Sequence, residues 1–431
     1  MSSDVNHSLL AFLQASPTPF HATQSLESFF HERGFIQLHE TDEWNIQPGQ
    51  GYFYSRSGSS IIAFIAGRKP VLEGGIRVIG AHTDSPCLKL KPQPGICTLG
   101  YQQLSVEVYG GVLLYPWFDR DLSLAGRVSY LDTQGKLGSS LVDFKRPVAT
   151  VPSLAIHLDR TANENRTVNP QTQMSPIVGL GSEFDFRQLL KAQLEEQKVA
   201  NVREVLDFNL CCYDTQPPAL VGIHQEFIAS ARLDNLLSCY IGAEALAASD
   251  GEHTAVLVCN DHEEVGSRTD IGAQGPMLQE WLQRLVPDAE KRQRVIRGSL
   301  MVSVDNAHGV HPNFKDKHDQ AHGPVLNQGP VIKFDADQGY ATNDVTSSFL
   351  RWLGAQGESE VPLQSYVTRA DMRCGSTIGP LTASNIGIKT VDIGVPTFAM
   401  HSVRELAGAK DTQNLLELLK KFVLITELPK K

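Results

Sequence analysis

The first eighty residues alternate between helical and strand-like patterns of apolar positions. Apolar residues recur at helical spacing over 9–13, and a second helical pattern covers 21–33 and stops at a glycine. Short β-rich runs at 52–54 and 61–65 are separated by Ser-Gly-Ser-Ser, which suits a hairpin. The sequence therefore predicts two helices and a hairpin, followed by a short apolar strand at 77–80.

The middle of the chain is rich in strand patterns and poor in helical ones. Short β-rich runs at 104–109, 126–131 and 136–144 are separated by turn residues. A helical pattern returns only at 186–199. We expect an inserted β-rich domain with one helix over residues 92–229.

From about residue 230 strand and helix patterns alternate. The predicted helices cover 233–248, 277–294, 343–353 and 412–425, and the predicted strands cover 255–259, 300–304, 332–334 and 390–393. This alternation is typical of an α/β fold with a mainly parallel sheet flanked by helices. Because 431 residues exceed what one core usually organises, we expect two domains, one formed by 1–91 and 230–431 and the other by the inserted segment 92–229.

Composition narrows the class of protein. The formal net charge of −10 argues against a nucleic-acid partner, which needs a positive surface. The seven cysteines are scattered without a CxxC pair, which favours reduced thiols over disulfides or a thiolate zinc site. The N-terminus has no basic region followed by an apolar run, and no apolar stretch is long enough to span a bilayer. We expect a cytoplasmic enzyme without a membrane partner.

Polar residues with metal-binding chemistry collect where the predicted strands end. They are His82, Asp84, Asp234, the run Asp261-His-Glu-Glu264, the run Asp305-Asn-Ala-His308, and His401. Ligands of open α/β sheets bind beyond the carboxyl ends of the strands, so these side chains are expected at one edge. Imidazole nitrogen and carboxylate oxygen are ligands that zinc accepts in catalytic sites.

The residue types also suggest a division of roles. Two metals about 3.5–4 Å apart need a shared carboxylate, and Asp234 is the natural bridge. In the Glu263-Glu264 pair, one residue can bind metal while the other accepts a proton from water. Asp84 follows His82 by two positions, so on an extended segment it can orient the imidazole. Taken singly, these residues also suit a helix cap, a solvated charge pair or a surface pair, and only their joint order indicates a metal site.

These segments make the chain resemble the M18 aminopeptidases, the aspartyl aminopeptidase family. The resemblance runs from Pro17-Thr-Pro-Phe-His21 to Met400-His-Ser-Val-Arg404. Its most specific segments are Gly80-Ala-His-Thr-Asp-Ser-Pro86, Asp261-His-Glu-Glu-Val-Gly-Ser267, Asp305-Asn-Ala-His-Gly-Val-His-Pro-Asn313 and Gly375-Ser-Thr-Ile-Gly-Pro380. It implies a fold of the zinc exopeptidase type and a two-zinc aminopeptidase that removes N-terminal residues from peptides, preferring Asp or Glu.

The resemblance also implies a role for individual residues. The implied zinc ligands are His82, Asp234 as the bridge, Glu264, Asp305 and His401, with Glu263 as the general base. The implied substrate contacts are His308, Lys333, Tyr340 and His157, the last offered to the active site of an adjacent subunit. The resemblance further implies a homo-oligomer, a tetrahedral dodecamer, with 1–91 and 230–431 as the catalytic domain and 92–229 as a dimerisation or oligomerisation domain. Related families favour a cis peptide after the bridging aspartate, so we expect one between Asp234 and Asn235.

Several alternatives stay open at this point. Lys333 can contact substrate or pair with a carboxylate such as Asp335 or Asp337. Arg369, Asp371 and Arg373 suit either a loop salt-bridge network or a role in shaping the site. Manganese or cobalt can replace zinc at oxygen-rich sites. A related two-metal amidohydrolase that deacylates amino acids, or a metal-stabilised scaffold shell, is the competing function, although a scaffold has no need of Glu263.

Overall fold

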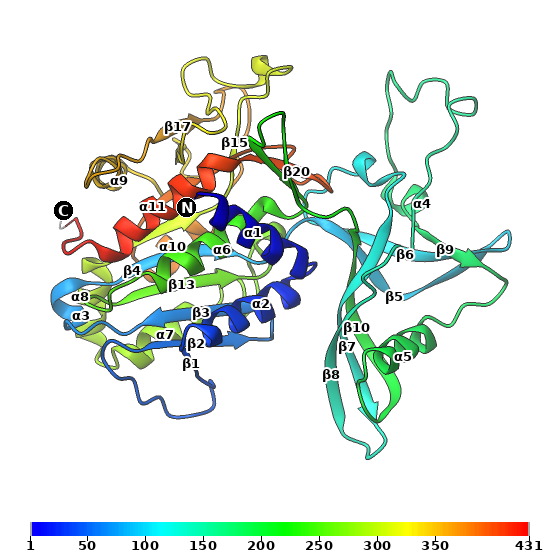
Figure 1. Cartoon of the computed structure of the whole chain (residues 1–431), viewed down its shortest axis with the longest axis horizontal. Coiled ribbons are helices and arrows are strands. Elements are labelled where there is room, and N and C mark those ends of the chain that lie inside the picture. The colour runs from blue at the N-terminus through cyan, green and yellow to red at the C-terminus, as the bar shows by residue number, and fades with distance from the viewer. Residues whose placement is uncertain (1, 430–431) are drawn as a thin grey trace. The chain divides into compact units, whose positions relative to one another are not determined.

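The computed structural model describes residues 2–429, which form two compact units (Figure 1). The first unit runs to Asp84 and includes residues 218–400 and the chain from Glu405 onwards. The second unit comprises residues 85–217 and 401–404. This unit differs from the predicted 92–229 segment at both ends. At the first end, residues 87–98 already form a strand that pairs within the second unit. At the other end, residues 219–221 and 227–230 form strands that pair within the first unit.

A nine-stranded mixed sheet forms the centre of the first unit. Its strands, in order across the sheet, are β1 (Ile36–Gln37), β2 (Gly51–Arg56), β3 (Ser60–Ile65), β13 (Ala255–Asn260), β4 (Arg77–His82), β14 (Leu300–Val304), β18 (Lys389–Gly394), β16 (Val331–Phe334) and β17 (Gln364–Val367). The neighbours β13, β4, β14 and β18 run parallel. Every residue of β3, β13, β4 and β14 is buried, as expected for strands that are covered on both faces.

Helices cover both faces of this sheet. They are α1 (Ser2–Ala15), α2 (Pro19–Glu32), α3 (Val71–Gly74), α6 (Leu233–Ala247), α7 (Met277–Leu285), α8 (Ala289–Gly298), α9 (Asp344–Gly354), α10 (Ile378–Ile386) and α11 (Ala409–Leu424). Alternate strand residues enter different hydrophobic cores, so Ile79 packs with residues of α1, α2, α6, α9 and α11, whereas Val78 packs with residues of α7, α8 and α10. The predicted α/β class is confirmed.

A smaller sheet of the first unit carries part of the candidate site. Its strands are β11 (Ala219–Val221), β12 (Phe227–Ser230), β20 (Glu405–Gly408), β19 (Pro396–Phe398) and β15 (Ala307–His308). Across the part of the chain that the structure describes, no helix has the length and apolar character needed to cross a bilayer.

One predicted element is wrong. The sequence predicts a single helix over 277–294, but α7 ends at Leu285 and α8 begins at Ala289. Pro287 lies between them, and proline removes a helical N–H donor and disfavours helical geometry in the residue before it. The Asp288 carboxylate then accepts a hydrogen bond from the Lys291 backbone N–H at 2.8 Å and caps the second helix.

The second unit is a six-stranded antiparallel sheet with two short helices. Its strands, in order, are β8 (Leu137–Asp143), β7 (Leu122–Asp132), β10 (Val202–Asp214), β5 (Cys87–Thr98), β6 (Tyr101–Tyr109) and β9 (Ile177–Leu180), and its helices are α4 (Pro170–Gln173) and α5 (Phe186–Glu196). Helix α5 contributes Phe186, Leu190 and Leu194 to the core under the sheet. The role of this unit in oligomerisation stays a prediction.

Arg77 supplies the first stability prediction. It is fully buried at the start of β4, and its guanidinium donates to the backbone oxygens of Gly74, Gly75, Ile425 and Thr426. Arg77→Leu leaves these four acceptors, of which the Gly75 oxygen is in a buried bond, without their donor, so we expect a loss of about 3 kcal/mol of unfolding free energy, measured as a lower midpoint of urea unfolding. Arg297→Leu is the control, because exposed Arg297 makes one bond, to the Gly387 oxygen. Equal midpoints for the two variants would contradict the prediction.

Candidate metal centre

Neighbouring parallel strands bring the candidate residues to one edge of the main sheet. His82 ends β4, and its Cα pairs in register with Asn260 at the end of β13. Glu263 lies in the turn directly after β13, and Asp305 follows the end of β14. Because β13, β4 and β14 run parallel and adjacent, their carboxyl ends lie together, which is where α/β sheets bind ligands.

His82 lies at the centre of a compact group of possible metal ligands. One ligand atom from each of His82, Asp234 and Glu264 lies within 4.8 Å of the others. The Nε2 atom of His82 is 3.3 Å from Oδ1 of Asp234 and 3.5 Å from Oδ1 of Asp305. The structure therefore brings together four of the five residues predicted as zinc ligands, while their role as ligands stays a prediction.

Asp84 connects the imidazole of His82 to the glutamate turn. The Nδ1 atom of His82 lies 3.1 Å from the backbone oxygen of Asp84 and 3.4 Å from its Oδ1. The two carboxylate oxygens of Asp84 accept hydrogen bonds from the backbone N–H groups of Glu263 and Glu264, both at 3.1 Å. Asp84 is fully buried, so it can fix the orientation of His82 and the position of the glutamates at once.

The peptide bond between Asp234 and Asn235 is cis, as predicted. Its position is held on both sides, because the Asp234 N–H donates to Oε2 of Glu405 at 2.9 Å and the Asn235 side chain donates to the Val304 oxygen at 2.8 Å. Asp234 is not the cap of α6, since Arg232 occupies the N-cap position without a capping side-chain bond. The carboxylate of Asp234 is directed instead at His82.

Burial and crowding of like charges perturb the acids of this cluster. Burial, with the nearby Asp305 charge, raises the pKa of Asp234 to about 7. Burial also raises the pKa of Glu263 to about 8, with Asp305 and Glu264 acting in the same direction against His82. For Asp305 burial acts upwards, but Lys333 and His82 outweigh it and hold its pKa below the usual range. Burial opposes the charged form of His82, yet its carboxylate neighbours raise its pKa well above normal.

This donor set fits zinc. One imidazole and several carboxylates converge in a buried space, and Oδ1 of Asp305 is buried without a hydrogen bond among residues 2–429. Uncompensated carboxylates are costly to bury, and a divalent cation offsets that cost. Zinc takes nitrogen and oxygen ligands of these types.

Lys333 has a partner that the sequence did not predict. It lies in β16 with 2% of its side chain exposed, and its Nζ is 3.3 Å from Oδ2 of Asp305. The alternative that Lys333 pairs with a protein carboxylate is thus confirmed, although the partner is Asp305 and not one of the examples Asp335 and Asp337. A contact from Lys333 to substrate stays a prediction. The Lys333 Nζ also lies 5.3 Å above the ring of Tyr340. Lys333 thus joins a predicted metal ligand to a predicted substrate contact.

Tyr340 belongs to a small apolar cluster. Ala307, Val331, Tyr340 and Tyr366 are buried together, with Cys374 packed against them. His308 is exposed at the end of β15, with its ring centroid 5.7 Å from that of Tyr366. Burial and the neighbouring Cys374 thiol raise the pKa of Tyr340 above its ordinary value, so its hydroxyl keeps its proton. Tyr366 and Cys374 are not predicted from the sequence, because no local motif distinguishes them.

Two predicted residues belong to the second unit. His401 has a left-handed backbone conformation with φ of 67°, and its Nδ1 lies 3.0 Å from the Gly111 oxygen. His157 is exposed in a turn between β8 and α4. The predicted roles of His401 as a zinc ligand and of His157 as a contact to a neighbouring subunit stay predictions.

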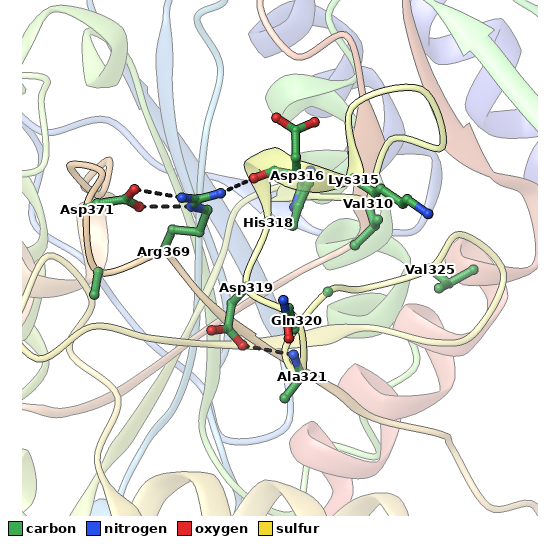
Figure 2. Close-up of a pocket in the computed structure, with 12 residues that line it drawn as sticks. Val310, Lys315, Asp316, His318, Asp319, Gln320, Ala321, Val325, Arg369 and Asp371 are labelled. Carbon is green, nitrogen blue, oxygen red and sulfur yellow. Dashed lines mark hydrogen bonds and ion pairs between the residues drawn. The ribbon is translucent and has the colours of Figure 1, made fainter.

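Arg369 and Asp371 form a loop salt bridge beside a pocket of about 840 Å³ in the first unit. Nε and Nη2 of Arg369 donate to the Asp371 carboxylate at 2.8 and 2.6 Å. Figure 2 shows the guanidinium between Asp371 and the backbone oxygen of Asp316. Of the two interpretations of this pair, the salt bridge is therefore observed.

Comparisons with known proteins agree with this chemistry. Residues 12–423 match the sequence model of the family described as aminopeptidase I zinc metalloprotease (M18). The chain is 57% identical over 434 residues to a probable M18 family aminopeptidase 2 of Pseudomonas putida GB-1, covering 100% of both chains. Its fold resembles Ape4 in the Ape4–Nbr1 complex, with a TM-score of 0.94, 37% identity, and coverage of 98% of this chain and 86% of that one. It also resembles the S. cerevisiae mApe1 dodecamer, with a TM-score of 0.82, 27% identity, and coverage of 97% and 96%.

Proposed function

Because the chain belongs to the M18 family of zinc metallopeptidases and is a metallo-aminopeptidase, we propose that it uses two zinc ions to remove acidic N-terminal residues from peptides. The observation that carries the proposal is the convergence of His82, Asp234 and Glu264 within 4.8 Å at the carboxyl edge of the sheet. In this proposal the first unit has the zinc exopeptidase type of fold and carries catalysis.

The proposed zinc ligands are His82, Asp234, Glu264, Asp305 and His401, with Asp234 shared between the two ions. Manganese or cobalt are the proposed substitutes. When bound, zinc supplies Lewis acidity that polarises the scissile carbonyl and lowers the pKa of water. Asp84 keeps Nδ1 of His82 engaged, which leaves Nε2 directed at the carboxylates.

Glu263 is the proposed general base. It lies beside Glu264 in the turn that Asp84 fixes, so its carboxylate faces the same acid cluster without being one of the proposed ligands. In the proposed reaction it accepts a proton from the attacking water and delivers it to the leaving amine. The Tyr340 hydroxyl or the exposed His308 ring donates to the oxygen that develops negative charge.

Lys333 supports the proposed preference for acidic residues. An ammonium group has three N–H donors, and the Asp305 contact at 3.3 Å uses one of them. The same Nζ lies 5.3 Å from the ring of Tyr340, which belongs to the small apolar cluster. A substrate carboxylate placed there would compensate the buried positive charge further.

We expect the protein to hydrolyse Asp- and Glu-p-nitroanilide at least about tenfold faster than the Leu and Lys amides. Lys333→Met should reduce this ratio, because it removes the donor without adding a charge. Lys389→Met is the control, since Lys389 is a half-buried lysine whose Nζ donates to the Pro429 oxygen. Equal rates on all four amides would refute acidic selectivity, and activity on N-acyl amino acids alone would favour a deacylase.

A homo-oligomer is also part of the proposal. The mApe1 relative is a dodecamer, and the second unit of this chain exposes large apolar side chains, including Leu99 at 92% and Leu180 at 76%. Such exposed apolar residues favour a contact with another chain. We extend the proposal to a tetrahedral dodecamer in the cytoplasm, in which His157 reaches the site of a neighbouring subunit.

A further inference from the structure

Asp392 is a buried carboxylate to which the proposed reaction assigns no role. It lies in β18 with no exposed surface. Its Oδ2 accepts a hydrogen bond from the Ala341 backbone N–H at 2.7 Å, and its Oδ1 accepts one from the Thr377 hydroxyl at 2.7 Å. Asp392 therefore ties the segment before α9 to the segment that begins α10.

The same strand position holds the Ala341 segment by a second route. The backbone N–H of Asp392 donates to the Thr342 hydroxyl at 2.9 Å. Side chain and main chain of one residue thus bind two consecutive residues, 341 and 342. Two hydrogen bonds that join Asp392 to consecutive residues restrict the 341–342 segment more than one bond would, because the segment can then neither shift nor rotate without breaking one of them.

The carboxylate itself has no room to move. A Cβ atom at Gly379 would lie 2.2 Å from Oδ1 and 2.4 Å from Oδ2 of Asp392, so the close approach of α10 requires glycine there. Thr377 caps α10 with the same hydroxyl that bonds Asp392, since it also accepts from the Gly379 N–H. Helix, strand and loop therefore fix one carboxylate in one orientation.

This restraint fixes the backbone next to Tyr340, which directly precedes Ala341. Its ring lies under the Lys333 ammonium at 5.3 Å, and Lys333 in turn is 3.3 Å from Asp305. A shift of the 341–342 backbone would therefore move the Tyr340 hydroxyl relative to the metal cluster. Small displacements of such donors are costly, because transition-state hydrogen bonds depend closely on geometry.

We propose that Asp392 is a positioning residue that holds the Tyr340 hydroxyl in place for the reaction, an inference that rests on the proposed function. Burial raises the pKa of Asp392, while the hydrogen bonds from Thr377 and Ala341 act in the opposite direction. An amide cannot replace it, because an Asn side chain has one acceptor oxygen for two donors.

A double-mutant cycle tests the proposal on the zinc-loaded full chain. We expect Asp392→Asn to lower kcat/KM by about tenfold or more, with unchanged zinc content. In a Tyr340→Phe background, where the hydroxyl is already absent, the same substitution should lower kcat/KM by less than about twofold. Additive losses in the two backgrounds would overturn the proposal, because they would mean that Asp392 acts independently of Tyr340.

Asp411→Asn is the matched control. Asp411 is equally buried and accepts backbone N–H bonds from Asn327 at 2.6 Å and Gly329 at 2.8 Å, but it does not bind the Tyr340 segment. Its replacement should lower the unfolding midpoint and leave kcat/KM unchanged. If Asp392→Asn does not fold, Thr342→Val removes the second tie and should give a smaller loss with the same dependence on Tyr340.

The proposal and the proposed function fail in different ways. If Glu263→Gln abolishes turnover but Asp392→Asn does not change kcat/KM, the function stands and the positioning role is wrong. If Glu263→Gln retains wild-type turnover, the proposed function itself is wrong.

Discussion

Replacing Glu263 by glutamine is expected to lower kcat by about 10²–10⁴-fold while folding and zinc content stay unchanged. Glutamine keeps the shape of the side chain but cannot accept the proton of the attacking water. The backbone N–H of residue 263 still bonds to Asp84, so the turn that presents Glu264 keeps its support. Rates on Asp-, Glu- and Leu-p-nitroanilide, with metal content determined on the same samples, measure the effect.

Glu244→Gln provides the control for this substitution. Glu244 is a partly buried glutamate of α6 that accepts a hydrogen bond from the Tyr240 hydroxyl at 2.7 Å and lies outside the acid cluster. Its replacement should leave kcat within about twofold of the wild-type value, as expected for a residue that does not touch the reacting groups. Near-normal turnover of the Glu263 variant would remove Glu263 from the role of base.

Local sequence patterns predicted those elements whose burial is visible in their own residues. The apolar runs of β13 and β14 predicted buried strands, since parallel strands are apolar on both faces. The polar residues just after these runs were then expected at one sheet edge, and the distances from His82 to Asp234 and Asp305 agree with that expectation. The cis peptide at Asp234 came from resemblance to related families, since spacing alone does not indicate it.

Other features could not be predicted, because they depend on contacts between segments that are distant in the sequence. Strand β10 was missed because charged and polar residues interrupt its apolar positions, and it is recognised by its pairing with β7. The ion pair between Lys333 and Asp305 joins residues 28 positions apart, whereas the neighbouring Asp335 was the obvious candidate. No local pattern distinguishes Asp392, because its partners Ala341 and Thr377 lie 51 and 15 positions away in the sequence.

The second large effect is expected from Asp234→Asn, which should lower activity. Its effect on unfolding stability should change sign between the metal-free and the zinc-loaded protein. Asp234 is the proposed shared ligand, so the variant should bind fewer zinc ions per chain and lose at least about 10³-fold in kcat/KM. Without zinc the ionised Asp234 carboxylate destabilises the folded state, because burial and the Asp305 charge raise its pKa to about 7. In the unfolded chain the Asp234 carboxyl loses its proton near its ordinary pKa of 3.8, whereas in the folded chain it keeps the proton up to about pH 7. The folded state is therefore destabilised increasingly as the pH rises from 3.8 to 7, and the full loss of folding free energy is present above pH 7.

At pH 8 the metal-free Asp234→Asn protein should therefore have an unfolding free energy higher than that of the metal-free wild type by an amount on the order of 1–4 kcal/mol. It should accordingly unfold at a higher temperature. Between pH 7 and pH 4 the difference should shrink, because wild-type Asp234 takes up its proton. Addition of zinc should reverse the order, since only the wild type gains the binding free energy of a shared ligand. Thermal unfolding at pH 5 and pH 8, with and without zinc, measures all of these differences. A variant that is less stable than the wild type in the metal-free state at pH 8 would show that the Asp234 carboxylate stabilises the fold by itself, and its assignment as a metal-dependent bridge would then lose its physical basis.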